Sequence, residues 1–174
     1  MDKYSIGEEL GQGTFGVVVK GREKRSGKLV ALKKFVLHDR KEGFPITAFR
    51  EITILKLLVH VNVIQILDVI FEGGNFYTVA PYISCDLNGV IHNPNINLQL
   101  GEIKCIMNQV LLGLEFIHNS GYLHRDIKSA NILLDWFGTV KIADFGLARK
   151  YHGEVSNLNV VGGGGGFVEY TAVV

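Results

Sequence analysis

Glycines followed by a strand-forming run mark the first segment whose residue types and spacing could hold phosphate. Gly11, Gly13 and Gly16 match the pattern G-x-G-x-x-G, and the β-branched residues 17–19 that follow favour a strand. In a dinucleotide-binding fold the last glycine would instead begin a helix. The pattern therefore predicts a glycine loop between two strands, whose backbone N–H groups can lie over phosphates. A plain hairpin that needs glycine only for its turn is the alternative.

A second segment, residues 124–131, carries the strongest chemical signal. His124, Arg125, Asp126, Lys128 and Asn131 stand at a spacing that chance would produce in well below about one in a thousand chains of this length. Asp126 can accept a hydroxyl proton, Lys128 can neutralise phosphate charge, and Asn131 can ligate magnesium. We expect His124 to be packed as scaffolding, and Arg125 to be a buried clamp on the loop that follows.

A third segment, Asp144-Phe145-Gly146, follows an apolar run at residues 139–143 that predicts a strand. It places a carboxylate at a strand end, beside a glycine that permits a turn. The tripeptide alone carries little information, but its order and spacing after residues 124–131 are informative. Asp144 and Asn131 would offer the hard oxygen ligands that Mg²⁺ prefers, and phosphate oxygens would complete the coordination shell.

A lysine and a glutamate are predicted to form an ion pair that belongs with these segments. In the predicted strand around Lys33, alternation places Ala31 and Lys33 on one face and Val30 and Leu32 on the other. Glu51 lies on the apolar stripe of a predicted helix, where a carboxylate is costly unless a cation neutralises it. Most lysines in strands are simply solvated. Because Glu51 needs a cation, we expect Lys33 to pair with it.

The elements that would position these residues follow from hydrophobic periodicity. Apolar runs at residues 4–10, 15–20 and 29–36, separated by tight turns, predict an antiparallel sheet. A helix that starts at Pro45 would place Ala48, Glu51, Leu55 and Leu58 on one face. The rest of the chain predicts strands at residues 61–71, 75–83, 131–134 and 139–143, and a helix over residues 103–119 that ends near Gly121 and whose apolar face is Ile103, Ile106, Met107, Val110, Leu114 and Ile117.

Composition excludes several classes of function. Of 174 residues, 47% are hydrophobic, which is enough for a core, and 18 Lys and Arg against 17 Asp and Glu leave a net charge of +1. This balance, with no basic stripe, argues against direct nucleic-acid binding and against binding to a membrane surface by bulk charge. No apolar stretch reaches the about 18 residues of a spanning helix. Two isolated cysteines, Cys85 and Cys105, predict a reducing compartment.

These motifs, in this order, resemble those of the protein kinases over nearly the whole chain. Residues 44–51, F-P-I-T-A-F-R-E, are similar to the cyclin-contacting helix of the cyclin-dependent kinases. The P-I-T-A-x-R-E form resembles the branch of that family that phosphorylates RNA polymerase II during transcription elongation. Residues 86–94 and 124–131 look most like the fungal Bur-type member of that branch.

The resemblance implies an α+β, protein-kinase-like fold, with an N-terminal lobe of antiparallel β-sheet and one helix, and the beginning of a mainly helical C-terminal lobe. Residues 1–84 would form the ATP-binding lobe and hinge, and residues 85–150 the start of the second lobe with the catalytic loop. Residues 151–174 would be part of an activation loop, expected to be mobile because residues 162–166 are five glycines. The family continues into further helices, so we expect a fragment of a longer kinase, truncated within the activation loop.

The resemblance also implies roles for individual residues, with ATP and Mg²⁺ as the cofactors. Lys33 would hold the α- and β-phosphates, and Glu51 would hold Lys33. Asp126 would be the catalytic proton acceptor, assisted by Lys128. The remaining site residues would be Asn131 and Asp144 for magnesium and, for the ATP pocket, Leu10, Gly11, Gly13, Gly16, Val18, Ala31 and Leu133, with the hinge at residues 81–84.

Two threonines are candidate regulatory sites. By resemblance, Thr171 in its Tyr-Thr context would be the activating threonine, whose phosphate would pair with Arg50, Arg125 and Arg149. Thr14 keeps a hydroxyl within the glycine loop and is a second candidate.

The sequence departs from the family at two positions of the pocket. Phe15 stands where the cell-cycle members carry an inhibitory tyrosine, so tyrosine phosphorylation cannot silence this loop. Ala80 stands where the family usually carries a bulky side chain such as phenylalanine. We expect the small side chain to open a back pocket beside the adenine.

The function that the resemblance implies is that of a nuclear serine/threonine kinase, with the cytoplasm as a second location. It would transfer the γ-phosphate of ATP to Ser/Thr-Pro sites of the RNA polymerase II tail, with a cyclin bound through the helix from Pro45 to Glu51. We expect no direct contact with nucleic acid or membrane. Two alternatives stay open: a cell-cycle cyclin-dependent kinase, and a truncated, non-catalytic protein that binds nucleotide or cyclin.

Overall fold

The fold is taken from a computed structural model that describes residues 2–13, 16–35 and 46–151. Several predictions lie outside these residues: the regulatory sites Thr14 and Thr171, the helix start at Pro45, and the mobility of the activation loop, of which only Tyr151 is described. Among the helices of the described ranges, none combines the length and the apolar character that crossing a membrane would require.

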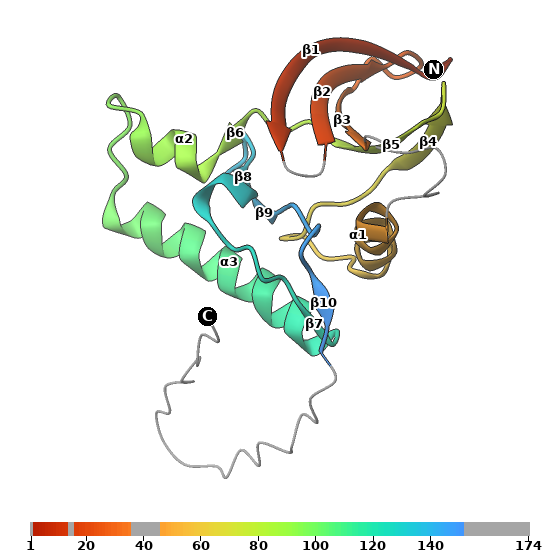
Figure 1. The fold of residues 1–174 in the computed structure, drawn as a ribbon. Helices are drawn as coiled ribbons and strands as arrows, with labels where there is room; N and C mark the ends of the chain where they lie inside the picture. Colours follow the sequence, from red (N-terminus) through yellow and green to blue (C-terminus); the bar gives the residue numbers. More distant parts are fainter. Residues whose placement is uncertain (1, 14–15, 36–45, 152–174) are drawn as a thin grey trace.

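The first half of the chain forms a five-stranded antiparallel sheet with one helix beside it (Figure 1). The strand order is β1-β2-β3-β5-β4, so β3 lies in the middle of the sheet. The predicted antiparallel sheet with one helix is therefore confirmed. The elements are β1 (Tyr4–Gly13), β2 (Gly16–Glu23), β3 (Leu29–Phe35), α1 (Ile46–Leu57), β4 (Asp68–Glu72) and β5 (Asn75–Pro81).

At strands β3 and β5, one face of the sheet packs in a small core and the opposite face carries Lys33. Val30 and Leu32 of β3 pack with Tyr77 and Val79 of β5 in a small core on one side of the sheet. Lys33, one residue further along β3, therefore points to the opposite side. The predicted alternation of this strand is confirmed.

Helix α1 buries the stripe that its sequence predicts. Ala48, Glu51, Leu55 and Leu58 are all buried, although Glu51 is the only carboxylate among them. The spacing of three and four residues brings Ala48, Glu51 and Leu55 to one face of α1, and Leu58, the residue after the helix, continues this stripe. A charged group is therefore held inside the protein, which requires a partner.

The predicted strand over residues 61–71 is wrong for its first part, because only β4 joins the sheet. The residues before it bond to the second half of the chain. The Ile142 N–H donates to the Asn62 carbonyl at 2.9 Å, and the Ile64 N–H donates to the Ile142 carbonyl at 2.9 Å. Val63 and Ile64 of this segment are buried in the core between the two halves, a burial that periodicity alone cannot distinguish from that of a strand.

The second half combines helices with short strands. Helix α3 is the long helix of the prediction, and Gly121, just after it, has a positive φ of 79°, as predicted for its C-terminal end. Three small elements pair in a sheet of order β6-β8-β9, and β10 pairs with β7. The elements are β6 (Cys85–Asp86), α2 (Leu87–His92), α3 (Leu100–Asn119), β7 (Tyr122–Leu123), the 3₁₀ turn Ser129–Asn131, β8 (Ile132–Leu134), β9 (Val140–Ile142) and β10 (Arg149–Lys150).

The buried face of α3 differs from the predicted one. Ile103 and Met107 are exposed, whereas Ile106 and Ile117 are buried as expected. The helix is thus rotated about its axis relative to the predicted orientation. Gly113 explains this rotation, because an added Cβ would lie 2.8 Å from the Ile142 side chain. The helix approaches β9 closely along the side that carries this glycine, and that contact sets its orientation.

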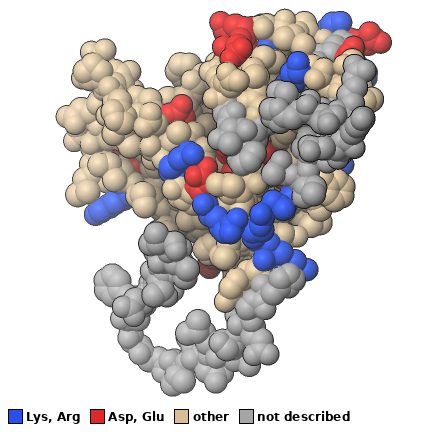
Figure 2. Space-filling model, in the orientation of Figure 1, with Lys and Arg blue, Asp and Glu red and all other residues tan. Residues whose placement is uncertain are grey.

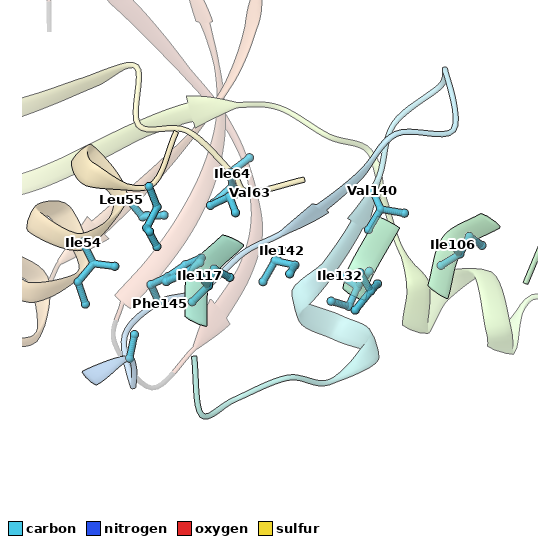
Figure 3. Close-up of a cluster of buried hydrophobic side chains, with 13 residues drawn as sticks. Ile54, Leu55, Val63, Ile64, Ile106, Ile117, Ile132, Val140, Ile142 and Phe145 are labelled. Carbon is cyan, nitrogen blue, oxygen red and sulfur yellow. The ribbon is translucent and has the colours of Figure 1, made fainter. Parts of the chain in front are cut away.

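One apolar core joins the two halves of the protein (Figure 3). It contains Ile54 and Leu55 of α1, Ile117 of α3, Ile142 of β9, and Phe145 just after β9. Because burial of such side chains stabilises the fold by about 1.5–3 kcal/mol each, the relative position of the halves is fixed by this cluster. The site described next lies beside it.

Candidate active site

A cavity of about 370 Å³ lies between the sheet and the second half of the chain. Eight of the nine predicted ATP-pocket residues line it, together with the predicted metal ligands Asn131 and Asp144. Gly13 is the one of the nine that is not among the described residues of the lining; it ends β1 and pairs with Gly16. The eight are Leu10, Gly11, Gly16, Val18, Ala31, Lys33, Glu51 and Leu133, and Pro81, Tyr82 and Ile83 of the predicted hinge join them.

The two glycines of the cavity have different constraints. Gly16 has a φ of 147°, and a Cβ at this position would overlap the carbonyl oxygen of Lys34. Gly11 has open space where its Cβ would lie. A glycine is therefore required at position 16, because the backbone of Lys34 lies too close for a side chain. At position 11 a small side chain would find space.

Lys33 is held by two carboxylates from distant parts of the chain. Its Nζ lies 2.8 Å and 3.0 Å from the two carboxylate oxygens of Glu51, and 3.0 Å from Oδ1 of Asp144. The Glu51 side chain is only 6% exposed and the Lys33 side chain 17%, whereas Asp144 is 37% exposed. The predicted Lys33–Glu51 pair is confirmed, and Asp144 extends it to a three-member network at the cavity wall.

The charges of this network depend on one another. Burial alone would lower the pKa of Lys33, but the carboxylates of Glu51 and Asp144 outweigh it and hold that pKa above its usual value. Burial raises the pKa of Glu51, and the Lys33 ammonium counteracts this rise. Lys33 is therefore a positive charge fixed in place beside the cavity, where it can bind a phosphate.

The backbone at Asp144 is unusual for a residue other than glycine. Its φ of 62° lies in the left-handed region, directly after β9 and Ala143. The next residue, Phe145, is fully buried and meets the His124 ring edge-on, with 4.6 Å between the ring centroids. Burial of Phe145 anchors the turn that directs the Asp144 carboxylate into the cavity.

Asp126, Lys128 and Asn131 form a second group of polar contacts. Lys128 Nζ lies 2.9 Å from Oδ2 of Asp126, and Asn131 Nδ2 donates to the same oxygen at 2.9 Å. Hydrogen bonds from Lys128 and Asn131 hold the pKa of Asp126 below its usual range. The structure therefore brings together the three residues that the spacing predicted, with Asp126 ionised near neutral pH.

His124 is buried, as expected of scaffolding. Its Nε2 lies 3.0 Å from the Ala143 carbonyl, and its Nδ1 accepts from the Asp126 N–H at 3.3 Å. These contacts require Nε2 to carry the proton of a neutral ring, and burial lowers the pKa of His124 accordingly. His124 thus connects the loop at Asp126 to the strand end before Asp144.

The prediction of a buried clamp at Arg125 is wrong in one respect. Its side chain does bind the following loop, because Nε donates to the Leu147 carbonyl at 2.9 Å. Arg125 is nevertheless exposed, because its φ of 66° directs it away from the core that holds His124. A single hydrogen bond to a carbonyl does not require burial.

The donor atoms of Asn131 and Asp144 fit a magnesium ion. Asn131 uses Nδ2 to donate to Asp126, at 2.8 Å to the backbone oxygen and 2.9 Å to the side chain, which leaves its Oδ1 for a ligand. Asp144 offers a half-exposed carboxylate in the same cavity. Two oxygen donors with room for phosphate oxygens match the way Mg²⁺ is usually bound.

The inner end of the cavity contains residues that no motif indicated. Leu55, Ile64, Ile66 and Thr78 line it behind Ala80. Thr78 could have been found by alternation, because it lies two positions before Ala80 on β5. Ile64 and Ile66 could not, because residues 61–67 were predicted to belong to the sheet.

A basic hollow lies between α1 and β10. Figure 2 shows Lys and Arg atoms gathered on this face in the area between α1 and β10. The hollow measures about 420 Å³ and is lined by Arg50 of α1 and by Arg149 and Lys150 of β10. Two of the three arginines predicted to pair with a phosphorylated Thr171 are therefore brought together, whereas Arg125 is not in the lining.

Comparisons with known proteins agree with this geometry. Residues 4–168 match the family described as protein kinase domain. The chain is 55% identical to the Bur-type serine/threonine-protein kinase of Candida albicans and 47% identical to that of Saccharomyces cerevisiae, in each case over 98% of this chain and 25% or 28% of the relative. It is 46% identical to the probable cyclin-dependent kinase 9 of Schizosaccharomyces pombe, over 84% of this chain and 26% of the relative. The chain thus spans about a quarter of the length of these relatives, and it belongs to the protein kinase domain family.

Proposed function

We propose that the protein is a serine/threonine kinase of the cyclin-dependent type that acts in transcription elongation. The observation that carries this proposal is the network of Lys33, Glu51 and Asp144 at the wall of a cavity that Asn131 also lines. A fixed ammonium and two oxygen ligands at one cavity suit the triphosphate of ATP with its magnesium ion. The similarity to the Bur-type kinases and to cyclin-dependent kinase 9 supports the choice of branch.

ATP would bind with its base in the apolar part of the cavity. Ala31 and Leu133 line opposite halves of the cavity and offer flat apolar contact to a purine ring. The backbone of Pro81, Tyr82 and Ile83 borders the same space and offers hydrogen-bonding groups to the edge of the base. Lys33 would then hold the α- and β-phosphates.

The transfer step would bond the hydroxyl oxygen of a substrate serine or threonine to the γ-phosphorus. The bond between that phosphorus and the β,γ-bridging oxygen breaks, ADP leaves, and the hydroxyl proton passes to the Asp126 carboxylate. Lys128, 2.9 Å from Asp126, would neutralise charge on the transferred group. Magnesium, held by Asn131 and Asp144, would supply charge neutralisation on the phosphate oxygens.

A cyclin would bind over α1, by analogy with the similarity of residues 44–51 to the cyclin-contacting helix. Phe49 and Leu57 on this helix are 63% and 62% exposed. The same helix carries Glu51, which contacts Lys33 inside the cavity. A partner that fixes α1 would therefore also fix the lysine. The nuclear location follows from the proposed role in transcription.

The test is a phosphorylation assay with the intact protein as its own cells produce it. Transfer of ³²P from γ-labelled ATP is measured on an RNA polymerase II tail-repeat peptide, on the same peptide with alanine for each proline, and on a histone-type peptide. We expect strong labelling of the first peptide alone. Preference for the histone peptide would instead support a cell-cycle kinase, and ATP binding without transfer would support a non-catalytic binding protein.

A further inference from the structure

We propose that the turn between β8 and β9, residues 135–138, is a docking site for an uncharged, proline-rich segment of the protein substrate. This segment is called the aromatic turn below, because it carries Trp136 and Phe137. The inference rests on the proposed function, because that function supplies a substrate with Ser/Thr-Pro repeats. It adds a second contact with this substrate, away from the place of phosphoryl transfer.

The two aromatic side chains of the aromatic turn are almost fully exposed. Trp136 is 91% exposed and Phe137 is 94% exposed, whereas the next most exposed large apolar side chain of the described residues is Leu100 at 66%. Turn geometry does not require aromatic residues, since turns favour small and polar ones. A ring of this kind buries about 150–250 Å² when a partner covers it. The aromatic turn therefore offers a partner a large apolar contact.

Hydrogen bonds hold the backbone of the aromatic turn in one conformation. Oδ1 of Asp135 accepts from the Phe137 N–H at 2.9 Å and from the Thr139 N–H at 2.8 Å. The Gly138 N–H donates to the Asp135 carbonyl at 3.0 Å, and the Gly138 carbonyl accepts from Gln109 Nε2 of α3 at 2.9 Å. A partner that binds the two rings does not have to order the turn, which lowers the entropic cost of binding.

The charge of the aromatic turn indicates a neutral partner. Asp135 is the only charged residue of the turn, and its Oδ1 is already bound to two backbone N–H groups. Gln109, which holds the turn from α3, is uncharged. Serine, threonine and proline in an unphosphorylated repeat are uncharged as well. The turn thus matches the substrate before phosphorylation, whereas an acidic ligand would meet a carboxylate in the turn and no cation.

Exposed aromatic rings suit a proline-rich segment for two reasons. Such a segment adopts the extended polyproline II helix, and its proline rings pack on the faces of aromatic side chains. The backbone of this helix has no internal hydrogen bonds, so the indole N–H of Trp136 can donate to one of its carbonyls. Both contacts recur at each proline, which lets a repetitive tail bind in several registers.

One short hairpin separates the aromatic turn from the proposed metal ligands. β8 begins directly after Asn131, and β9 ends two residues before Asp144, so the turn lies at the opposite end of this hairpin (Figure 1). Three strand residues of about 3.3 Å each separate the two ends by roughly 10 Å. At about 3.1 Å per residue, a five-residue peptide reaches only about 6 Å beyond a central serine. A substrate of several repeats can reach both ends, whereas the five-residue peptide cannot.

The experiment measures phosphorylation by the intact protein of a five-residue Ser-Pro peptide and of a peptide of four polymerase-tail repeats. We expect Trp136→Ala and Phe137→Ala each to raise the KM for the long peptide by roughly 3- to 30-fold, as for aromatic anchors of interfaces. The kcat on the long peptide, and both constants for the short one, should stay within about twofold. Trp136→Phe keeps a ring and should recover most of the affinity. Phe71→Ala, which removes a 63% exposed ring on β4, is the matched control and should change neither KM.

A second measurement needs no turnover. Binding of the labelled four-repeat peptide to the intact protein is followed by fluorescence polarisation, and so is binding of the same peptide with alanine for each proline. We expect the alanine peptide to bind at least about tenfold more weakly, and Trp136→Ala to weaken binding of the proline peptide similarly. Thermal unfolding of Trp136→Ala should agree with that of the unaltered protein within about 2 °C, because the side chain is exposed.

The outcomes separate the docking site from the proposed function. An unchanged KM of Trp136→Ala on the long peptide would overturn the docking site, while labelling of both peptides would leave the kinase proposal standing. Equal binding of the proline and alanine peptides would also overturn it. So would a change from dimer to monomer in Trp136→Ala, because the rings would then hold two copies of the chain together. If neither peptide is phosphorylated, the proposed function is overturned, and the binding measurement alone decides on the docking site.

Discussion

The two polar groups of the site are built in opposite ways. The network of Lys33, Glu51 and Asp144 takes its members from β3, α1 and the end of β9, so it exists only when the two halves of the protein are packed together. Asp126 and Asn131, by contrast, belong to one loop and contact each other within six consecutive residues of sequence. Damage to the first group should affect folding and binding together, whereas damage to the second should affect the transfer step alone.

The largest expected effect comes from Asp126→Asn, which tests whether damage to the second group affects the transfer step without affecting folding. The amide cannot accept a proton, so turnover should fall by about 10²- to 10⁴-fold. Stability should change little, because the carboxylate is partly exposed, Lys128 can be solvated, and the amide oxygen of the new side chain can still accept the hydrogen bond from Asn131. Turnover is measured with the polymerase-tail peptide, and stability by urea unfolding. A loss of stability above about 2 kcal/mol would contradict the comparison.

The second prediction tests the buried network with a matched pair of lysines. Lys33→Met leaves Glu51 buried without its cation, which should lower the free energy of unfolding by about 3 kcal/mol and weaken ATP binding. Lys34→Met changes the next residue of the same strand, whose side chain lies on the other face of the sheet, and should stay within about 0.5 kcal/mol. Urea unfolding and nucleotide displacement on both variants provide the measurement. Equal effects at the two positions would refute the assigned role of Lys33.

Much of this architecture could be predicted from the sequence, and the failures share a cause. The Lys33–Glu51 pair was predictable because a carboxylate on an apolar helical stripe demands a cation. Asp144 as the second partner was not, since its contact with Lys33 spans 111 residues and depends on the packing of the halves. For the same reason, periodicity cannot distinguish the burial of Val63 and Ile64 from that of a strand. Local periodicity indicates that a segment is buried. It does not indicate which element the segment packs against, because that depends on tertiary contacts.

The third prediction concerns Gly16 and Gly11, the two glycines that line the cavity beside the first group. Gly16→Ala should lower the free energy of unfolding by about 1–3 kcal/mol, since its Cβ would overlap the Lys34 carbonyl at a strained φ. Gly11→Ala is the matched control, because its Cβ would meet open space. Thermal unfolding of the two variants should show a clear drop for Gly16→Ala alone. A similar drop for Gly11→Ala would mean that the cavity roof is more crowded than the structure shows.

The smallest expected effect is a pH dependence that joins the two groups through His124. This ring lies between the Asp126 N–H and the Ala143 carbonyl, and burial holds its pKa below the usual 6.5. Below pH 6.5 the unfolded chain therefore binds more protons at this position than the folded protein does. Stability from this group is fully present above pH 6.5 and is lost as the pH falls toward the lowered pKa, by up to about 1.4 kcal/mol for each unit of pKa difference.

His124→Gln removes this titration while offering a side-chain N–H near the Ala143 carbonyl. Urea unfolding at pH 5.0, 6.0, 7.0 and 8.0 should show that the difference between the unaltered protein and His124→Gln narrows as the pH falls, because only the former loses stability from this ring. The lowered pKa of His118 and the raised pKa of Glu51 act in both proteins, so they cancel in the difference. Parallel curves would mean that the ring titrates equally in the folded and unfolded states, and that the neutral bridge between the loop at Asp126 and the strand end at Ala143 does not exist.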